Sequence, residues 1–325
     1  MALANIDGDA KMTSNTRNLI GYMTLIAALT ILPAAGDYVT GLAAEVLIFA
    51  IFAMSLDLLI GYTGIVSFGH AAFFGLSAYT VITLGVHLGW NGWLALVAGV
   101  LMSAVGSAVI GFFCIRVKGI PFLMLTMAFS QLLYAISTRW RDVTGGTDGI
   151  GGFQRPLFFG QSLDDRIVQY YLIASGFLFT FWFLRRLIAS PLGSIFVGIR
   201  ENELRMHALG YPVQRFKLVS FVIGGSLAGL GGGLYAFYNG FVSSDILHWS
   251  LSGDAIMMVI LGGTGTVIGP VLGAMIFLLL KNVLSSYYAH WMMWLGVIFI
   301  MCVMFLPTGV WGLLEKLVFA REKTR

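Results

Sequence analysis

The chain has 325 residues, of which 58% are hydrophobic and only 10% are charged, and its formal net charge is +4. A soluble domain typically carries about 25% charged residues, so charge this sparse excludes a water-soluble globule of this size. The basic residues do not gather in a soluble domain, so nucleic acid is not an expected partner. A surface in contact with lipid needs little charge, and the composition therefore predicts an all-α polytopic membrane protein.

The first 18 residues are polar, and they include Lys11 and Arg17. The apolar run after them has no small-x-small cleavage site, which indicates a retained membrane span rather than a signal peptide. A membrane helix needs about 20 mostly apolar residues. The sequence predicts about ten such spans, with eight as the alternative, and the eighth candidate is short: 19–35, 39–60, 66–86, 93–115, 120–138, 167–184, 216–238, 252–262, 266–284 and 291–307.

The distribution of Lys and Arg predicts the orientation, because basic loops favour the cytoplasmic side. Basic residues dominate the tail 1–18, the loop around Lys118, the segment 185–217 and the tail 308–325, whereas basic and acidic residues balance in 139–166. We therefore expect both tails and 185–217 to be cytoplasmic, 139–166 to be external, and 19–307 to form the transmembrane domain. Cytoplasmic termini require an even number of crossings; eight would require part of 252–307 to enter the membrane and return.

A glycine-rich stretch, GYTGIVSFGHAAFFG, interrupts the apolar pattern at residues 61–75. Glycine in a membrane helix permits close helix packing, or it permits a break where the chain borders a cavity. Both alternatives are open from the sequence. The candidate helix-break or translocation-path residues here are Gly61, Thr63, Gly64, Ser67, Gly69 and His70.

The same pattern returns 201 positions later, in Gly262, Gly263, Thr264 and Gly265. Both stretches follow an apolar run that contains an acidic residue, and both lead into another apolar run. Duplicated halves are common in transporters, although short glycine-rich matches also arise by chance, so a true repeat is one of two interpretations. The predicted topology gives the two copies the same orientation.

Ionisable residues at membrane depth are functional candidates, and His70, Glu45, Asp57 and Asp254 qualify. Each also has a structural interpretation, as a hydrogen-bonded packing residue or a helix cap. Cys114 and Cys302 lie in apolar runs and have no metal-ligand spacing, so we expect neither a disulfide nor a metal site.

The chain has no phosphate-binding loop, metalloprotease motif or nucleophile elbow, which argues against an enzyme. We expect no cofactor bound by this chain, and energy for uphill transport would come from a gradient or from another subunit.

The long basic segment contains SPLGSIFVGIRENELRMHALGYPVQRFKL, residues 190–218. Ser190-Pro191 is a typical helix start, apolar residues recur at helical spacing, and Gly210 with Pro212 ends the pattern. The sequence predicts one short amphipathic helix over 194–209. Such a helix lies on the membrane surface or docks into a groove on a partner protein.

This segment resembles the cytoplasmic coupling region of inner-membrane permeases of bacterial ABC importers for branched-chain amino acids, specifically the longer of their two permease types. The match rests on Ser190, Pro191, Gly193, Ile199, Arg200, Glu201, Ala208, Leu209 and Gly210. The glycine-rich stretch at 61–75 resembles the same family. Further matches are Leu123 to Phe129, Thr144 to Gly149, and Leu261 to Pro270, in order along residues 54 to 275. The chain departs at Asp57, where the family usually carries asparagine.

The resemblance implies a permease subunit that pairs with a second permease and forms the translocation path with it. It also implies two ATP-binding subunits that use the ATP, a periplasmic substrate-binding protein, and a location in the bacterial inner membrane. Residues expected to couple to the ATP-binding subunits are Phe196, Ile199, Arg200, Glu201, Arg205 and Gly210. The alternatives are an autonomous channel or gradient-driven carrier, and urea or short amides as substrate.

Overall fold

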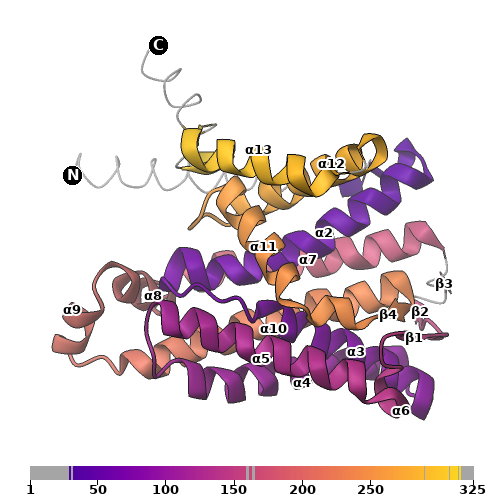
Figure 1. Cartoon of the computed structure of the whole chain (residues 1–325), viewed down its shortest axis with the longest axis horizontal. Coiled ribbons are helices and arrows are strands. Elements are labelled where there is room, and N and C mark those ends of the chain that lie inside the picture. Colours follow the sequence, from indigo (N-terminus) through magenta and orange to yellow (C-terminus); the bar gives the residue numbers. More distant parts are fainter. Residues whose placement is uncertain are drawn as a thin grey trace, which may run out of the picture.

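The structure is a computed structural model, which describes residues 29–30, 32–158, 161–162, 165–288, 290–306, 308–313 and 315. It is a bundle of helices with a few two-residue strands (Figure 1). The long helices are α2 (Asp37–Asp57), α3 (His70–Leu88), α4 (Gly92–Cys114), α5 (Ile120–Arg139), α7 (Arg166–Ile188), α10 (Val213–Asn239), α12 (Gly269–Tyr287) and α13 (Trp291–Phe305). The shorter elements are η1 (Leu32–Ala35), η2 (Leu58–Thr63), α6 (Arg141–Thr144), β2 (Leu157–Phe158), β3 (Gln161–Ser162), α8 (Pro191–Glu201) and α9 (Glu203–Ala208).

Eight of the described helices are long and apolar enough to cross a membrane. The chain is therefore an all-α, multi-pass membrane protein, as the composition predicted. The predicted total of ten crossings is not confirmed, because most of the first expected span, 19–35, lies outside the described residues. The part of it that is described ends in a 3₁₀ helix, η1.

The chain after α10 returns through the bundle in two pieces. Strand β4 (Phe241–Val242) pairs antiparallel with β1 (Ile150–Gly151), and the 3₁₀ helix η3 (Ser244–Leu247) and helix α11 (Trp249–Gly262) follow. With 14 residues, α11 spans about 21 Å of a hydrocarbon core that is about 30 Å thick. The Leu247 carbonyl accepts a hydrogen bond (2.7 Å) from Ser130, near the middle of α5. The expected span 252–262 is thus the helical part of a broken crossing, and protein covers its irregular backbone.

Helix α2 forms the centre of the bundle, and it packs against α7, α10, α11 and α12. Helices α3, α4 and α10 pack closely through small residues. The Ser103 hydroxyl lies 3.0 Å from the Phe73 carbonyl and 2.7 Å from the Gly225 carbonyl, so it connects all three helices. Lipid gives no hydrophobic driving force for helix association, so close backbone approach and such hydrogen bonds stabilise this packing.

The bundle has two distinct ends (Figure 1). One end carries α8 and α9, and Lys118 from the loop between α4 and α5 reaches Glu203 there. The opposite end carries α6, β1 and β4. The basic segment 185–217 and the charge-balanced segment 139–166 therefore lie at opposite ends, as the charge distribution predicted.

We predict that Gly232→Ala destabilises the fold, because a Cβ atom at Gly232 would collide with the Phe74 carbonyl across the α3–α10 contact. Overpacking of this kind typically costs about 1–3 kcal/mol. A thermal unfolding experiment in detergent should show a lower midpoint. Gly296→Ala in α13 is the matched control, because nothing lies within 4 Å of a Cβ atom at that position. Equal midpoints for the two variants would contradict the packing described here.

Candidate functional site

The two glycine-rich stretches that resemble each other in sequence meet in space. The Asp57 carboxylate accepts a hydrogen bond (2.9 Å) from the backbone N–H of Gly265. A Cβ atom at Gly61 would lie 2.6 Å from the Gly265 Cα atom, so the approach requires glycine at position 61. Gly265 has a φ of 76°, a left-handed conformation that favours glycine. The helix that begins as α2 ends here in the π turn η2, and Gly64 then adopts a left-handed conformation with φ of 76°. Of the two alternatives that the sequence left open, the chain shows a helix break here, since residues 64–69 are not helical.

Arg200 connects this pair of turns to α8. Its Nη1 atom donates a hydrogen bond to the Gly61 carbonyl. The same atom would lie 3.0 Å from a Cβ atom at Gly265, and the Arg200 Cγ atom would lie 3.2 Å from one at Gly64. One side chain of α8 therefore contacts both glycine turns, and any movement of α8 acts on the ends of α2 and α11.

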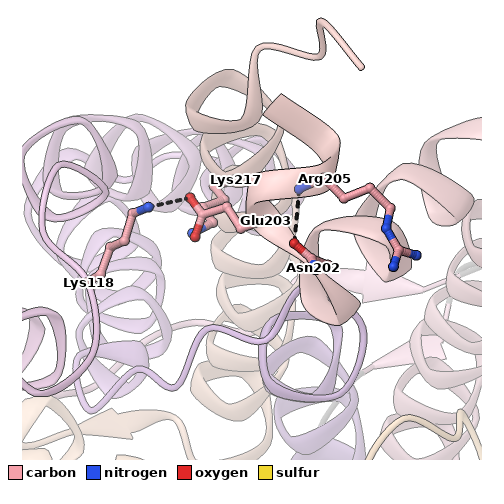
Figure 2. A network of polar contacts seen from close by, with 5 residues as sticks. All are labelled: Lys118, Asn202, Glu203, Arg205 and Lys217. Atoms are coloured by element: carbon pink, nitrogen blue, oxygen red, sulfur yellow. Dashed lines mark hydrogen bonds and ion pairs between the residues drawn. The ribbon is translucent and has the colours of Figure 1, made fainter. Parts of the chain in front are cut away.

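The segment after α7 contains two helices, so the prediction of a single helix over 194–209 was wrong. Asn202 has an extended conformation that ends α8, and its side chain accepts a hydrogen bond (2.9 Å) from the Arg205 N–H at the start of α9 (Figure 2). Asparagine commonly caps helix N-termini in this way. The apolar periodicity continues across the break, which explains why the sequence pattern did not reveal it.

The predicted coupling residues divide into two groups. Phe196 and Ile199 are buried against their own chain, so they anchor α8 and their side chains do not face a partner. Arg200, Glu201, Arg205 and Gly210 are exposed residues, although the Arg200 guanidinium points inward to Gly61. The most exposed apolar side chains of this segment are Leu204 and Leu209, which are 78% and 65% exposed. Apolar side chains this exposed on a protruding helix are typical of a contact surface.

Glu203 holds α9 in place, and sequence reasoning did not select it. Its two carboxylate oxygens each form an ion pair of 3.0 Å, one with Lys118 and one with Lys217 (Figure 2). Burial raises the pKa of Glu203, but the hydrogen bonds and charges of the two lysines outweigh that effect and leave the pKa below its usual value. The only sequence signal was that the loop around Lys118 and the segment 185–217 were expected on the same side of the membrane.

The remaining candidate residues lie around the glycine turns. Thr63 and Ser67 are buried, and a Cβ atom at Gly69 would press against the Thr126 backbone. Gly262 and Gly263 are buried beside the start of α12 and Thr308, whereas Thr264 is exposed. These contacts support close packing, and a role in lining a translocation path stays a prediction.

His70 is fully buried at the start of α3. Its Nε2 atom lies 2.8 Å from the Ser55 hydroxyl, and its ring stacks on Phe52 at a centroid distance of 5.5 Å. This environment is that of a packing residue between α2 and α3. Within the described part of the chain, no group of three or more His, Cys, Asp or Glu residues is arranged to hold a metal ion.

A family model described as "Branched-chain amino acid transport system / permease component" matches residues 38–307. The chain belongs to this permease family. The matched range includes η2, α8, α9 and the 262–265 turn, so the whole site described above falls within it.

Relatives agree with this assignment. The high-affinity branched-chain amino acid transport system permease protein LivM of Escherichia coli (strain K12) is 26% identical over 313 residues, which cover 88% of this chain and 74% of LivM. LivM of Salmonella typhimurium (strain LT2) is 26% identical, over 83% and 69% of the two chains. The autoinducer 2 import system permease protein LsrC of Klebsiella pneumoniae is 27% identical over about half of each. No solved structure matches the chain.

We predict that Glu203→Gln releases α9 of this permease, because two lysines lose their shared partner. Surface ion pairs contribute about 1 kcal/mol or less, so hydrogen–deuterium exchange of residues 203–209 at pH 7 should become several-fold faster. Since the pKa of Glu203 is lowered in the fold, the ion pairs stabilise fully above the unfolded pKa of about 4.3. The difference from wild type should disappear as the pH falls through the lower, folded pKa.

Glu201→Gln is the control for that experiment, because Glu201 is exposed and forms no ion pair with any described residue. Faster exchange in Glu201→Gln, or no change in Glu203→Gln, would contradict the assigned role of Glu203.

Proposed function

We propose that this chain is the membrane-spanning permease subunit of an ATP-driven ABC importer in the bacterial inner membrane. The observation that carries the proposal is the family match over residues 38–307, together with relatives named as permease proteins of transport systems. Both LivM relatives are named for the transport of branched-chain amino acids, and we propose the same substrate class here. The LsrC relatives are named for autoinducer 2 import, so autoinducer 2 is the alternative substrate.

We propose that α8 and α9 contact ATP-binding subunits on the cytoplasmic side. The exposed Leu204 and Leu209 would enter a groove on that partner, and Glu201 and Arg205 would form its polar rim. This arrangement, an apolar centre with charges around it, is usual at protein interfaces. With the α8–α9 end cytoplasmic, the segment 139–166 would face the periplasm, where a substrate-binding protein would dock. We propose cytoplasmic termini on the charge distribution alone.

The mechanism follows from the contacts of Arg200. When bound ATP draws the ATP-binding subunits together, α8 moves with them. Arg200 passes this movement to the Gly61 carbonyl and to the turn at Gly265, which end α2 and α11. Packed helices move as rigid bodies between discrete arrangements. Since α2 is the central helix, its displacement against a second permease would open the path alternately to each side.

We predict that Arg200→Met separates ATP hydrolysis from transport, because α8 loses its contact with both glycine turns. In proteoliposomes that contain both permeases, the ATP-binding subunits and the binding protein, ATP hydrolysis should persist while leucine uptake falls at least tenfold. Arg186→Met is the matched control, since Arg186 is an exposed arginine at the same end of the bundle. Normal uptake in Arg200→Met would contradict the mechanism. Uptake by the purified chain alone, without nucleotide, would favour an autonomous carrier or channel.

A further inference from the structure

A polar cavity of about 540 Å³ lies at the end of the bundle opposite α8 and α9. It is enclosed by the beginnings of α2 and α7, the end of α10 and the second half of α12. Its volume is within the range of about 300–1,000 Å³ that is usual for small-molecule sites. The cavity lies directly above the central helix α2, and neither the sequence patterns nor the coupling mechanism assigns it a role.

Two polar side chains face this cavity without a hydrogen-bond partner. Gln169 is only 5% exposed, and its amide forms no hydrogen bond with any described residue. Glu45 lies about 12 Å below the start of α2 at Asp37, because a helix rises about 1.5 Å per residue. Its carboxylate also lacks a hydrogen bond to any described residue, although the charge of Lys281 acts on it. Both side chains therefore have polar atoms that the described residues leave available to a ligand in the cavity.

The charges in the cavity have both signs. Arg166, in the first turn of α7, lines the wall together with Arg155. Arg155 is held in place, because its Nε and Nη2 atoms donate to the Phe237 and Tyr238 carbonyls at 2.8 Å and 2.9 Å. Arg166 has no ion pair with a described residue. The carboxylates of Glu45 and Asp37 supply the opposite charge, so the cavity is suited to a ligand that carries both charges.

The tyrosine at the cavity wall provides a further acceptor. The Tyr238 hydroxyl donates to the Gly41 carbonyl at 3.1 Å, which leaves its oxygen lone pairs available to a ligand N–H. Asn239 and Asn282 add amide groups at the rim. The arrangement is therefore complementary to a small zwitterion that carries a primary ammonium and an anionic group.

We propose that this cavity binds a free amino acid before translocation, with Glu45 receiving the α-ammonium and Arg166 the α-carboxylate. The choice of an aliphatic amino acid rests on the proposed function. The headgroup of phosphatidylethanolamine has the same chemistry, a primary ammonium beside an anion, and the experiment must separate the two sources.

The test uses the purified full chain in nanodiscs of phosphatidylglycerol and phosphatidylcholine, because neither lipid carries a primary ammonium. Radiolabelled leucine binding is measured, with leucinamide (ammonium only) and 4-methylpentanoate (carboxylate only) as competitors. Wild type should bind leucine at least tenfold more tightly than either analogue. Glu45→Gln should weaken leucine about tenfold and leave 4-methylpentanoate unchanged. Arg166→Gln should weaken leucine and 4-methylpentanoate and leave leucinamide unchanged.

Asp142→Asn and Arg139→Gln are the matched controls, because both residues are exposed at the same end and outside the cavity. Equal affinity for the three ligands in wild type would overturn the proposal, as would an equal loss for all three in either variant, which is the result of a purely structural role. If nanodiscs that contain phosphatidylethanolamine abolish leucine binding, the cavity holds a lipid headgroup and the amino-acid assignment is overturned. This experiment needs no ATP, so failure of the ATP-driven function and failure of the binding site are separable.

Discussion

The contact between the two glycine turns is the constraint on which the rest of this structure depends. A Cβ atom at Gly61 would lie 2.3 Å from the Gly265 backbone nitrogen, so a side chain there would push the two turns apart, and Gly265 has a left-handed φ of 76° that favours glycine. The Asp57 carboxylate then satisfies the Gly265 N–H, and Arg200 covers the Gly61 carbonyl. Backbone groups freed by a helix break at membrane depth must find partners within the protein. Here the partners come from α2 and from α8, so the break and the coupling segment stabilise each other.

Close approach of helix backbones at small residues also determines how the rest of the bundle packs. Helices α3, α4 and α10 meet where serine and glycine allow their backbones to approach, and the broken crossing from Phe241 to Gly262 fits between α3 and α5 because Gly75 leaves room for Leu247. In contrast, α13 has no buried residue among those described, so its surface is available to lipid or to another subunit. Close approach between helix backbones thus determines the packing of the interior. The peripheral helix α13 needs only an apolar surface.

Composition and apolar run length were sufficient to predict the helical membrane fold and most of its spans, because the solvent imposes that pattern on any such chain. The glycine pattern at 61–69 predicted a break, and the similarity to 262–265 identified the two stretches that touch. Their mutual contact was not predictable, since 201 residues separate them and no local rule pairs them. The break at Asn202 was missed because apolar spacing continues through it. Glu203 was missed because its two lysine partners come from different parts of the chain, the loop before α5 and the beginning of α10.

We propose that the α8–α9 end lies in the cytoplasm, where ATP is available, and the coupling mechanism depends on this orientation. Leu204 is the most exposed large apolar side chain of α8 and α9. A Leu204→Cys variant of a chain in which Cys114 and Cys302 are replaced by alanine should therefore be labelled by a membrane-impermeant maleimide in inside-out vesicles. Intact spheroplasts should remain unlabelled until they are lysed. Labelling of intact spheroplasts, with none in inside-out vesicles, would place this end outside the cell and contradict the account.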